Sequence, residues 1–196
     1  MSAMVKNGGV DRLPPIAPAD WTEEQRRAAQ EVIAGARGGL VPPFIPLLRS
    51  PELMTHAQRM GEYLRYRSAI GKRLSELAIL VTARQWSQPV EWAIHAPIAV
   101  NVGVDPGIVE SIAQGKRPAQ MSAEEAAVHD FCIELHRHKA VSDATWARAI
   151  ERLGEKGAVD LIGICGYYAL LSMVMNAART PVPESSLPPT RSFTPA

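Results

Sequence analysis

The sequence predicts an all-α fold, a bundle of seven or eight helices around a central antiparallel helix pair. Capping boxes, in which a Ser or Thr is followed three residues later by Gln or Glu, begin at Thr22 and Ser122. Two segments, 73–86 and 156–179, are apolar on most sides, as is typical of helices buried inside a bundle. No stretch of useful length alternates apolar and polar residues as a half-buried strand would.

Each expected helix has a local reason to begin or end where it does. Ser50 and Asp105 each precede a proline, an arrangement that suits the cap and first position of a helix. Gly103 and Gly154 suit helix ends that need left-handed backbone. The proline-rich stretch 41–48 is expected to turn and to hold at most one short helix. The expected helices span about 23–36, 51–68, 73–86, 89–103, 106–115, 123–139, 143–154 and 156–179.

Composition narrows the class of protein. Of the 196 residues, 46% are apolar and 21% are charged, and 21 basic against 20 acidic residues give a net charge of +1. These values suit one soluble domain with a sizeable core. No basic patch with interleaved aromatic residues indicates a nucleic-acid partner. We expect an irregular N-terminal arm over 1–20, a single helical domain over 21–181 and an extended Pro/Ser-rich tail over 182–196.

The location in the cell is inferred from the N-terminus and from the cysteines. The first residues lack the apolar core of a signal peptide. Cys132 and Cys165 each stand alone in an apolar helical context, without a CxxC pair. They are interpreted as buried structural thiols, and a cytoplasmic location is expected.

The segment 158–178 is long and apolar enough to resemble a membrane span. Polar side chains nevertheless recur along it, and no second such segment follows. We interpret it as the central helix of a soluble bundle, with no membrane partner. Its polar residues are Asp160, Tyr167, Tyr168, Ser172 and Asn176.

The candidate site lies on the helix pair at 73–103, joined by a tight turn before Pro89. Glu91 and His95 stand four residues apart, on one face of the second helix. Glu76 can face them if the first helix packs antiparallel across the turn. Carboxylates and an imidazole on apolar helices are costly to bury unless they pair or take part in chemistry. Pro97 should bend the second helix just after His95.

This pattern resembles the carboxymuconolactone decarboxylase family, which shares its helical fold with the alkyl hydroperoxidase D proteins. The peroxidase branch of that fold carries Glu, then CxxC, then His. Glu76 and His95 match the outer positions, whereas Gln88 and Glu91 stand where the two thiols would be. The dithiol peroxidase chemistry of that branch is therefore excluded by the motif.

The decarboxylase branch instead carries Glu-x-x-x-His, which Glu91 and His95 match, together with the upstream Glu76. The resemblance implies a cofactor-independent lyase of aromatic catabolism, acting on a small organic acid or lactone. It also implies a homo-oligomer, a trimer or a hexamer. Decarboxylation, isomerisation and ring opening all remain open as the reaction.

Each site residue has a structural alternative. His95 is either the general acid and base or a core histidine satisfied by Glu91. Glu91 either orients the ring or is itself the base, and Glu76 either belongs to the site or only caps a helix or pairs with a neighbouring cation. The expected substrate pocket is lined by Trp86, Gln88, Trp92 and Tyr167, although tryptophans in such positions are more often core residues than part of a ligand wall.

Two further expectations concern ligands. His129, His136 and His138 share one helix but lack the i, i+4 spacing of a helical metal pair, so no metal site is expected there. No cofactor is expected. The alternative to an enzyme is an oligomeric helical protein that binds a hydrophobic small molecule without chemistry.

Overall fold

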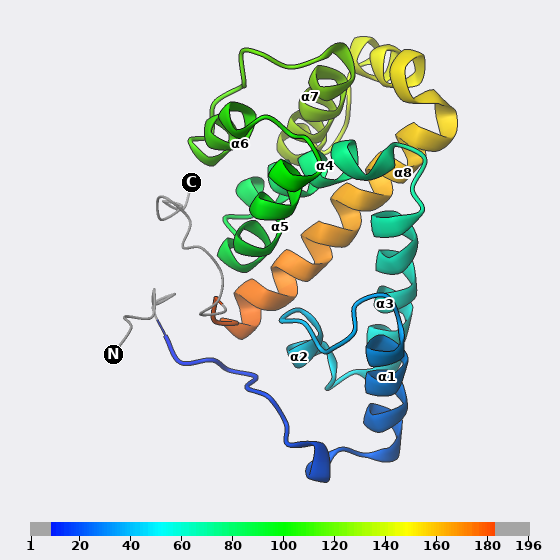
Figure 1. Cartoon of the computed structure of the whole chain (residues 1–196), viewed down its shortest axis with the longest axis vertical. Helices are drawn as coiled ribbons and strands as arrows, with labels where there is room; N and C mark the ends of the chain where they lie inside the picture. Colours follow the sequence, from blue (N-terminus) through cyan, green and yellow to red (C-terminus); the bar gives the residue numbers. More distant parts are fainter. Residues whose placement is uncertain (1–8, 183–196) are drawn as a thin grey trace.

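The computed structural model describes residues 9–182 and is all-helical over that range. A 3₁₀ turn, η1 (Pro18–Asp20), precedes eight α-helices (Figure 1). The helices are α1 (Glu23–Ala34), α2 (Phe44–Leu47), α3 (Pro51–Tyr66), α4 (Gly71–Gln85), α5 (Pro89–Asn101), α6 (Pro106–Ala113), α7 (Ala123–His138) and α8 (Asp143–Ala178). The predicted fold class and helix number are therefore confirmed. The predicted tail lies almost wholly outside the described residues.

Local sequence determines where several helices begin. The capping boxes at Thr22 and Ser122 both form, each with its reciprocal pair of hydrogen bonds. Ser50 occupies the cap position of α3, but its side chain makes no capping hydrogen bond with any described residue. The proline after it still presets the backbone for the first helical turn.

Helix α4 is the centre of the bundle. It packs against α3, α5, α6, α7 and α8, and ten consecutive side chains from Leu74 to Ala83 are buried. A helix enclosed on all sides has no polar face, which explains the lack of amphipathic pattern in its sequence. Within this run Glu76 is the one ionisable side chain.

Helix α8 crosses the bundle diagonally and contains a break (Figure 1). Gly154 has φ 69° and ψ 172°, outside the helical region. The glycine therefore separates a short first part, which follows α7, from the long apolar part, as the sequence predicted. Backbone of this kind is accessible to glycine almost alone.

By length and composition α8 could cross a membrane, but 56% of its most apolar stretch is buried inside the bundle. Tyr167 and Tyr168 are both buried in it, and Asp160 accepts hydrogen bonds from the Tyr63 hydroxyl and the Ala69 amide. Polar groups satisfied within the protein are typical of a core helix.

The N-terminal arm has no regular structure from residue 9 to residue 17. It is attached at the opposite end of the chain, where the Arg12 amide donates to Ala178 O at 2.8 Å and its guanidinium to Ala177 O at 3.1 Å. Arg49 holds the next part of the arm by donating to Pro14 O at 2.6 Å. The arm thus caps the C-terminal end of α8, whose last carbonyls have no partner within the helix.

The two cysteines differ from the expectation in one respect. Both are buried free thiols, as predicted, but they do not stand alone. Their sulfur atoms lie 3.4 Å apart, Cys132 on α7 and Cys165 on α8. The contact with Cys165 and burial raise the pKa of Cys132, so this thiol stays protonated.

Candidate active site

The turn between α4 and α5 is held by Gln88. Ser87 adopts left-handed backbone with φ 48°, and the Gln88 side chain then caps α5 by accepting from the Val90 amide at 2.6 Å. The side-chain Nε2 of Gln88 also donates to Asn176 Oδ1 at 2.8 Å. The predicted pocket residue Gln88 is fully buried and is engaged in these contacts, which fix the helix pair against α8.

The three predicted acid–base residues come together inside the bundle. His95 Nδ1 lies 2.6 Å from Glu76 Oε2, and His95 Nε2 lies 3.3 Å from Glu91 Oε2. His95 is 3% exposed and each glutamate 1%. The imidazole is therefore held between two carboxylates, one from each helix of the pair, and the shorter contact is with Glu76.

This arrangement determines the charge of His95. Burial disfavours the imidazolium, but the negative charge of Glu76, the hydrogen bonds to Glu76 and Glu91 and the charge of Glu91 outweigh it. Together they raise the pKa of His95 to about 9. At neutral pH the ring is protonated, so Nδ1–H donates to Glu76 and Nε2–H to Glu91.

Each carboxylate keeps one oxygen without a partner among the residues that the structure describes. Glu76 Oε1 and Glu91 Oε1 are buried and accept no hydrogen bond from any described residue. Buried polar atoms are paired in the great majority of cases, so unpaired ones call for an explanation. Two such acceptors beside one imidazolium indicate a place where a ligand's donor groups would bind.

Two tyrosines of α8 close the site from the side of the core. The ring of Tyr168 meets His95 edge-to-face, with centroids 5.2 Å apart, and Tyr167 packs in the same way on Tyr168. Burial raises the pKa of Tyr167 to about 12 and also raises that of Tyr168. Both phenols are therefore protonated at neutral pH. The sequence singled out Tyr167 for the pocket, but Tyr168 is the one in contact with His95.

Sequence reasoning missed a polar network that continues outward from Tyr167. Arg37, in the loop after α1, donates to the Tyr167 hydroxyl at 3.4 Å and to the Gln58 side chain. Gln58 in turn donates to Glu62 at 3.0 Å. The positive charge of Arg65 also acts on both tyrosines. No spacing in the sequence relates Arg37 to a helix 130 residues away.

The tryptophans divide between two environments. Trp92 is 4% exposed and belongs to the hydrophobic core, which is the alternative weighed from the sequence. Trp86 is half-buried at the end of α4, and its backbone carbonyl accepts from Asn176 Nδ2 at 3.0 Å. Over residues 9–182 no cluster of three or more His, Cys, Asp or Glu side chains is placed to hold a metal ion.

Comparison with known proteins defines the class of fold. No family model and no curated protein matches the chain. Solved structures do match, and they have the alkylhydroperoxidase AhpD fold, which is the fold that the sequence predicted.

One similar structure is an alkylhydroperoxidase AhpD core, an uncharacterized peroxidase-related protein from Ralstonia eutropha JMP134. It has a TM-score of 0.70 and 18% identity, over 85% of this chain and 88% of that chain. Another is an uncharacterized peroxidase-related protein from Silicibacter sp. TM1040, with a TM-score of 0.71 and 16% identity, over 88% of this chain and 91% of that chain. At such identities the likeness shows the fold alone.

Proposed function

We propose that the protein is an enzyme that moves a proton on a small organic acid or lactone, with His95 as the general acid and base. The observation that carries this proposal is the buried imidazolium between two carboxylates, each with one oxygen that has no partner over residues 9–182. A histidine kept only for packing would need one partner. Two ionised partners are costly to bury, which favours a role in chemistry.

The two contacts suggest a division of roles. Glu76, at 2.6 Å, holds Nδ1 and fixes the ring, so it is a positioning residue. Glu91, at 3.3 Å, makes the longer contact with Nε2. A substrate can displace that contact more easily, so Nε2 is the nitrogen that faces the reaction. From the sequence, Glu91 could either orient the ring or act as the base. With Glu76 making the shorter contact, we assign the orienting role to Glu76.

A carboxy-lyase reaction fits these groups. The bond between the substrate and its carboxylate breaks, carbon dioxide leaves, and the electron pair passes to a conjugated carbonyl of the substrate. Nε2–H of His95 then donates a proton to the carbanion, and Glu91 or solvent returns one to the ring. The substrate's own carbonyl accepts the electrons, so the step requires no cofactor. Isomerisation or ring opening would use the same proton transfer.

The test compares His95→Gln with wild type for carbon dioxide release from carboxylated γ-lactones. The substitution keeps the size and hydrogen bonding of the side chain but removes titration near neutral pH. General acid–base groups contribute roughly 10²–10⁴-fold, so turnover should fall by about that factor. Glu91→Gln should reduce turnover by a similar factor if Glu91 exchanges protons with the ring, and less if it does not.

Three controls make the result specific. His56→Gln alters an exposed histidine on α3 and should leave turnover unchanged. Cys132→Ser and Cys165→Ser should also leave it unchanged, because neither thiol touches the site. Full activity in folded His95→Gln would end the acid–base proposal. Loss of activity in the serine variants would instead favour thiol chemistry, and binding of lactone without turnover by wild type would favour the non-catalytic alternative.

A further inference from the structure

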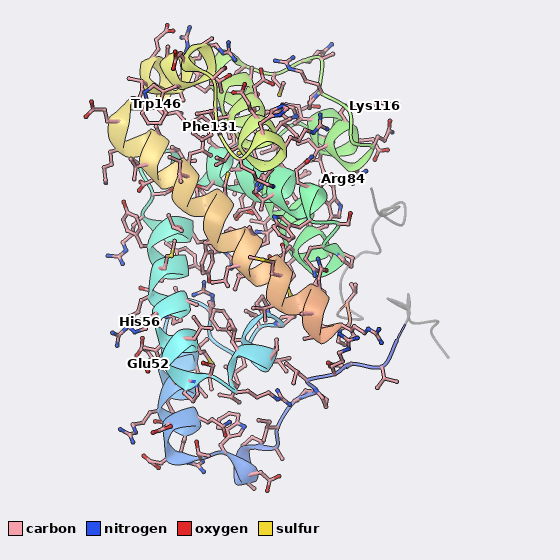
Figure 2. All side chains as sticks on the ribbon, turned by 180° about the vertical axis from the view of Figure 1, so that it is seen from behind. Glu52, His56, Arg84, Lys116, Phe131 and Trp146 are labelled. Atoms are coloured by element: carbon pink, nitrogen blue, oxygen red, sulfur yellow. The ribbon has the colours of Figure 1, made fainter. Side chains whose placement is uncertain are left out.

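A polar pocket lies between α4, α6 and α7, and His95 is not among its lining residues. Its volume is about 190 Å³. Among the described residues that line it, four side chains are cationic and one, Asp130, is a carboxylate. Figure 2 shows Arg84 and Lys116 together beside α6 and the loop that follows it. The cations are Arg84, Lys116, Arg117 and Arg137.

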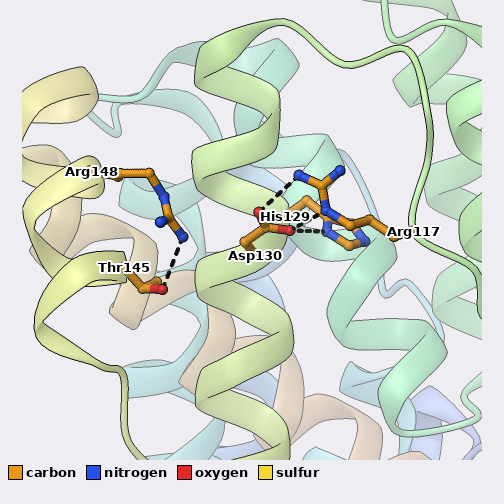
Figure 3. Close-up of polar contacts among 5 residues, drawn as sticks. All are labelled: Arg117, His129, Asp130, Thr145 and Arg148. Carbon is orange, nitrogen blue, oxygen red and sulfur yellow. Dashed lines mark hydrogen bonds and ion pairs between the residues drawn. The ribbon is translucent and has the colours of Figure 1, made fainter.

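One wall of the pocket is held together by Asp130, whose carboxylate contacts both Arg117 and His129. Arg117 donates to both oxygens of Asp130, at 2.9 Å each. His129 Nδ1 lies 3.0 Å from the same Asp130 Oδ1 (Figure 3). His129 is 4% exposed and anchors this wall from the core side, whereas the Arg117 side chain is 56% exposed. Both oxygens of Asp130 accept from Arg117, so the charge of this carboxylate is already paired within the wall.

The opposite wall is positioned by the turn after α6. Arg84 donates from Nε to Ala113 O at 3.1 Å. Gly115, with φ 71°, lets the chain turn against the guanidinium, since a Cβ there would lie 3.2 Å from Arg84 Nη2. Lys116 follows directly and is exposed. Neither Lys116 nor Arg137 forms an ion pair with a carboxylate of the described residues.

The charge balance and the floor of the pocket indicate its ligand. The described lining holds four cations and one carboxylate, and two of the cations, Lys116 and Arg137, form no ion pair with a described carboxylate. Like charges gathered in a concave site repel one another until an anion binds. Guanidinium groups suit carboxylate and phosphate oxygens, which they bind in a bidentate manner. The floor is apolar, formed by Val81, Ile112 and Ile133.

We infer that this pocket binds a small organic dianion, with its charged group among the cations and its apolar part on the floor. A phosphate monoester and a dicarboxylate share this chemistry. The pocket is independent of His95, so the inference does not depend on the proposed reaction.

The experiment measures binding to the full chain by calorimetry at constant ionic strength. Phenyl phosphate and phthalate distinguish the two sources of the dianion, and inorganic phosphate tests the apolar floor. We expect saturable binding of at least one aromatic dianion, tighter than that of inorganic phosphate. Lys116→Gln should weaken it by about tenfold, the loss of one hydrogen bond to a charged group.

The matched control is Arg148→Gln, which removes one positive charge from an exposed side chain outside the pocket (Figure 3). It should leave the affinity unchanged. Lys116 is exposed and unpaired with any described carboxylate, so its replacement leaves the fold intact, which circular dichroism verifies. Binding weakened equally by both substitutions would mean that only net charge attracts the anion. That result, a lack of saturable binding, or equal affinity for inorganic phosphate would each overturn the inference.

Discussion

At His95 the neighbouring charges decide whether a buried ring carries a proton. An exposed histidine has a pKa near 6.5, and burial alone would lower it. Two carboxylates at 2.6 Å and 3.3 Å reverse that effect. The pKa of about 9 means that the His95 ring stays protonated throughout the physiological pH range.

The raised pKa predicts how stability depends on pH. The folded protein holds the proton more tightly than the unfolded chain does. The stabilisation is therefore complete below about pH 6.5 and is lost as the pH rises to about 9. From a shift of this size we expect the free energy of unfolding to decrease by about 3 kcal/mol over that range. Urea denaturation at a series of pH values measures the decrease.

His95→Gln provides the control for this prediction, because the variant cannot titrate at that position. Its stability should lack the His95 component of the decrease, so the difference between the two proteins isolates the ring. Parallel curves for wild type and variant would show that His95 does not hold its proton in this way.

At the residue scale, sequence predicted those contacts whose partners are related by helical spacing or by a short turn. Glu91 and His95 meet because they lie one helical turn apart, and Glu76 joins them across a turn that Gln88 caps. Tyr168 and Arg37 could not be placed in this way. Their positions depend on how α8 and the loop after α1 pack, which local sequence does not determine.

Among the elements, the approach of α3 to α8 depends on one residue without a side chain. Gly61 is buried in α3, and a Cβ there would overlap the hydroxyl of Tyr167 and lie 2.6 Å from Arg37 Nη2. A glycine in a helix normally costs about 1 kcal/mol relative to alanine. Here the closeness of the two helices outweighs that cost.

Gly61→Ala should therefore destabilise the protein despite the better helix propensity of alanine. Overpacking of this kind costs typically 1–3 kcal/mol, which urea denaturation would detect. The control is a double-mutant cycle with Tyr167→Ala, which removes the overlapping side chain. The combined loss should be smaller than the sum of the two single losses. Additive losses would mean that the two residues do not compete for space.

The helix boundaries show the same division between local and distant causes. The capping boxes of α1 and α7 were predictable because they require residues three apart. The contact between Cys132 and Cys165 was not, because it joins two helices at a point that only their packing defines.

For the whole molecule, the exposed face of α8 is a candidate interface for the predicted homo-oligomer. Val159, Ile162 and Met173 are 61%, 40% and 46% exposed and fall on one face of the helix. An apolar stripe of this kind is typical of a subunit interface. A stripe that pairs with itself requires a twofold axis, which a dihedral hexamer contains and a cyclic trimer lacks.

We expect light scattering to give the mass of three or six chains, each of 21.3 kDa. Met173→Glu should shift that mass toward the monomer, because a charge buried in an apolar interface is costly. Leu53→Glu, at a 43% exposed position on α3, is the matched control and should leave the assembly unchanged. A wild-type mass of one chain at micromolar concentration would contradict the prediction.

The attachment of the N-terminal arm has a consequence for how the chain is made. Arg12 leaves the ribosome 165 positions before its partner Ala177. The arm cannot dock before α8 has been synthesised, and until then the carbonyls of Ala177 and Ala178 lack these partners. The contact also has one of the longest sequence separations available in the chain, and such contacts carry the largest loop-closure entropy. Closing the bundle at this point is therefore a late event of folding, completed only after α8 has been synthesised.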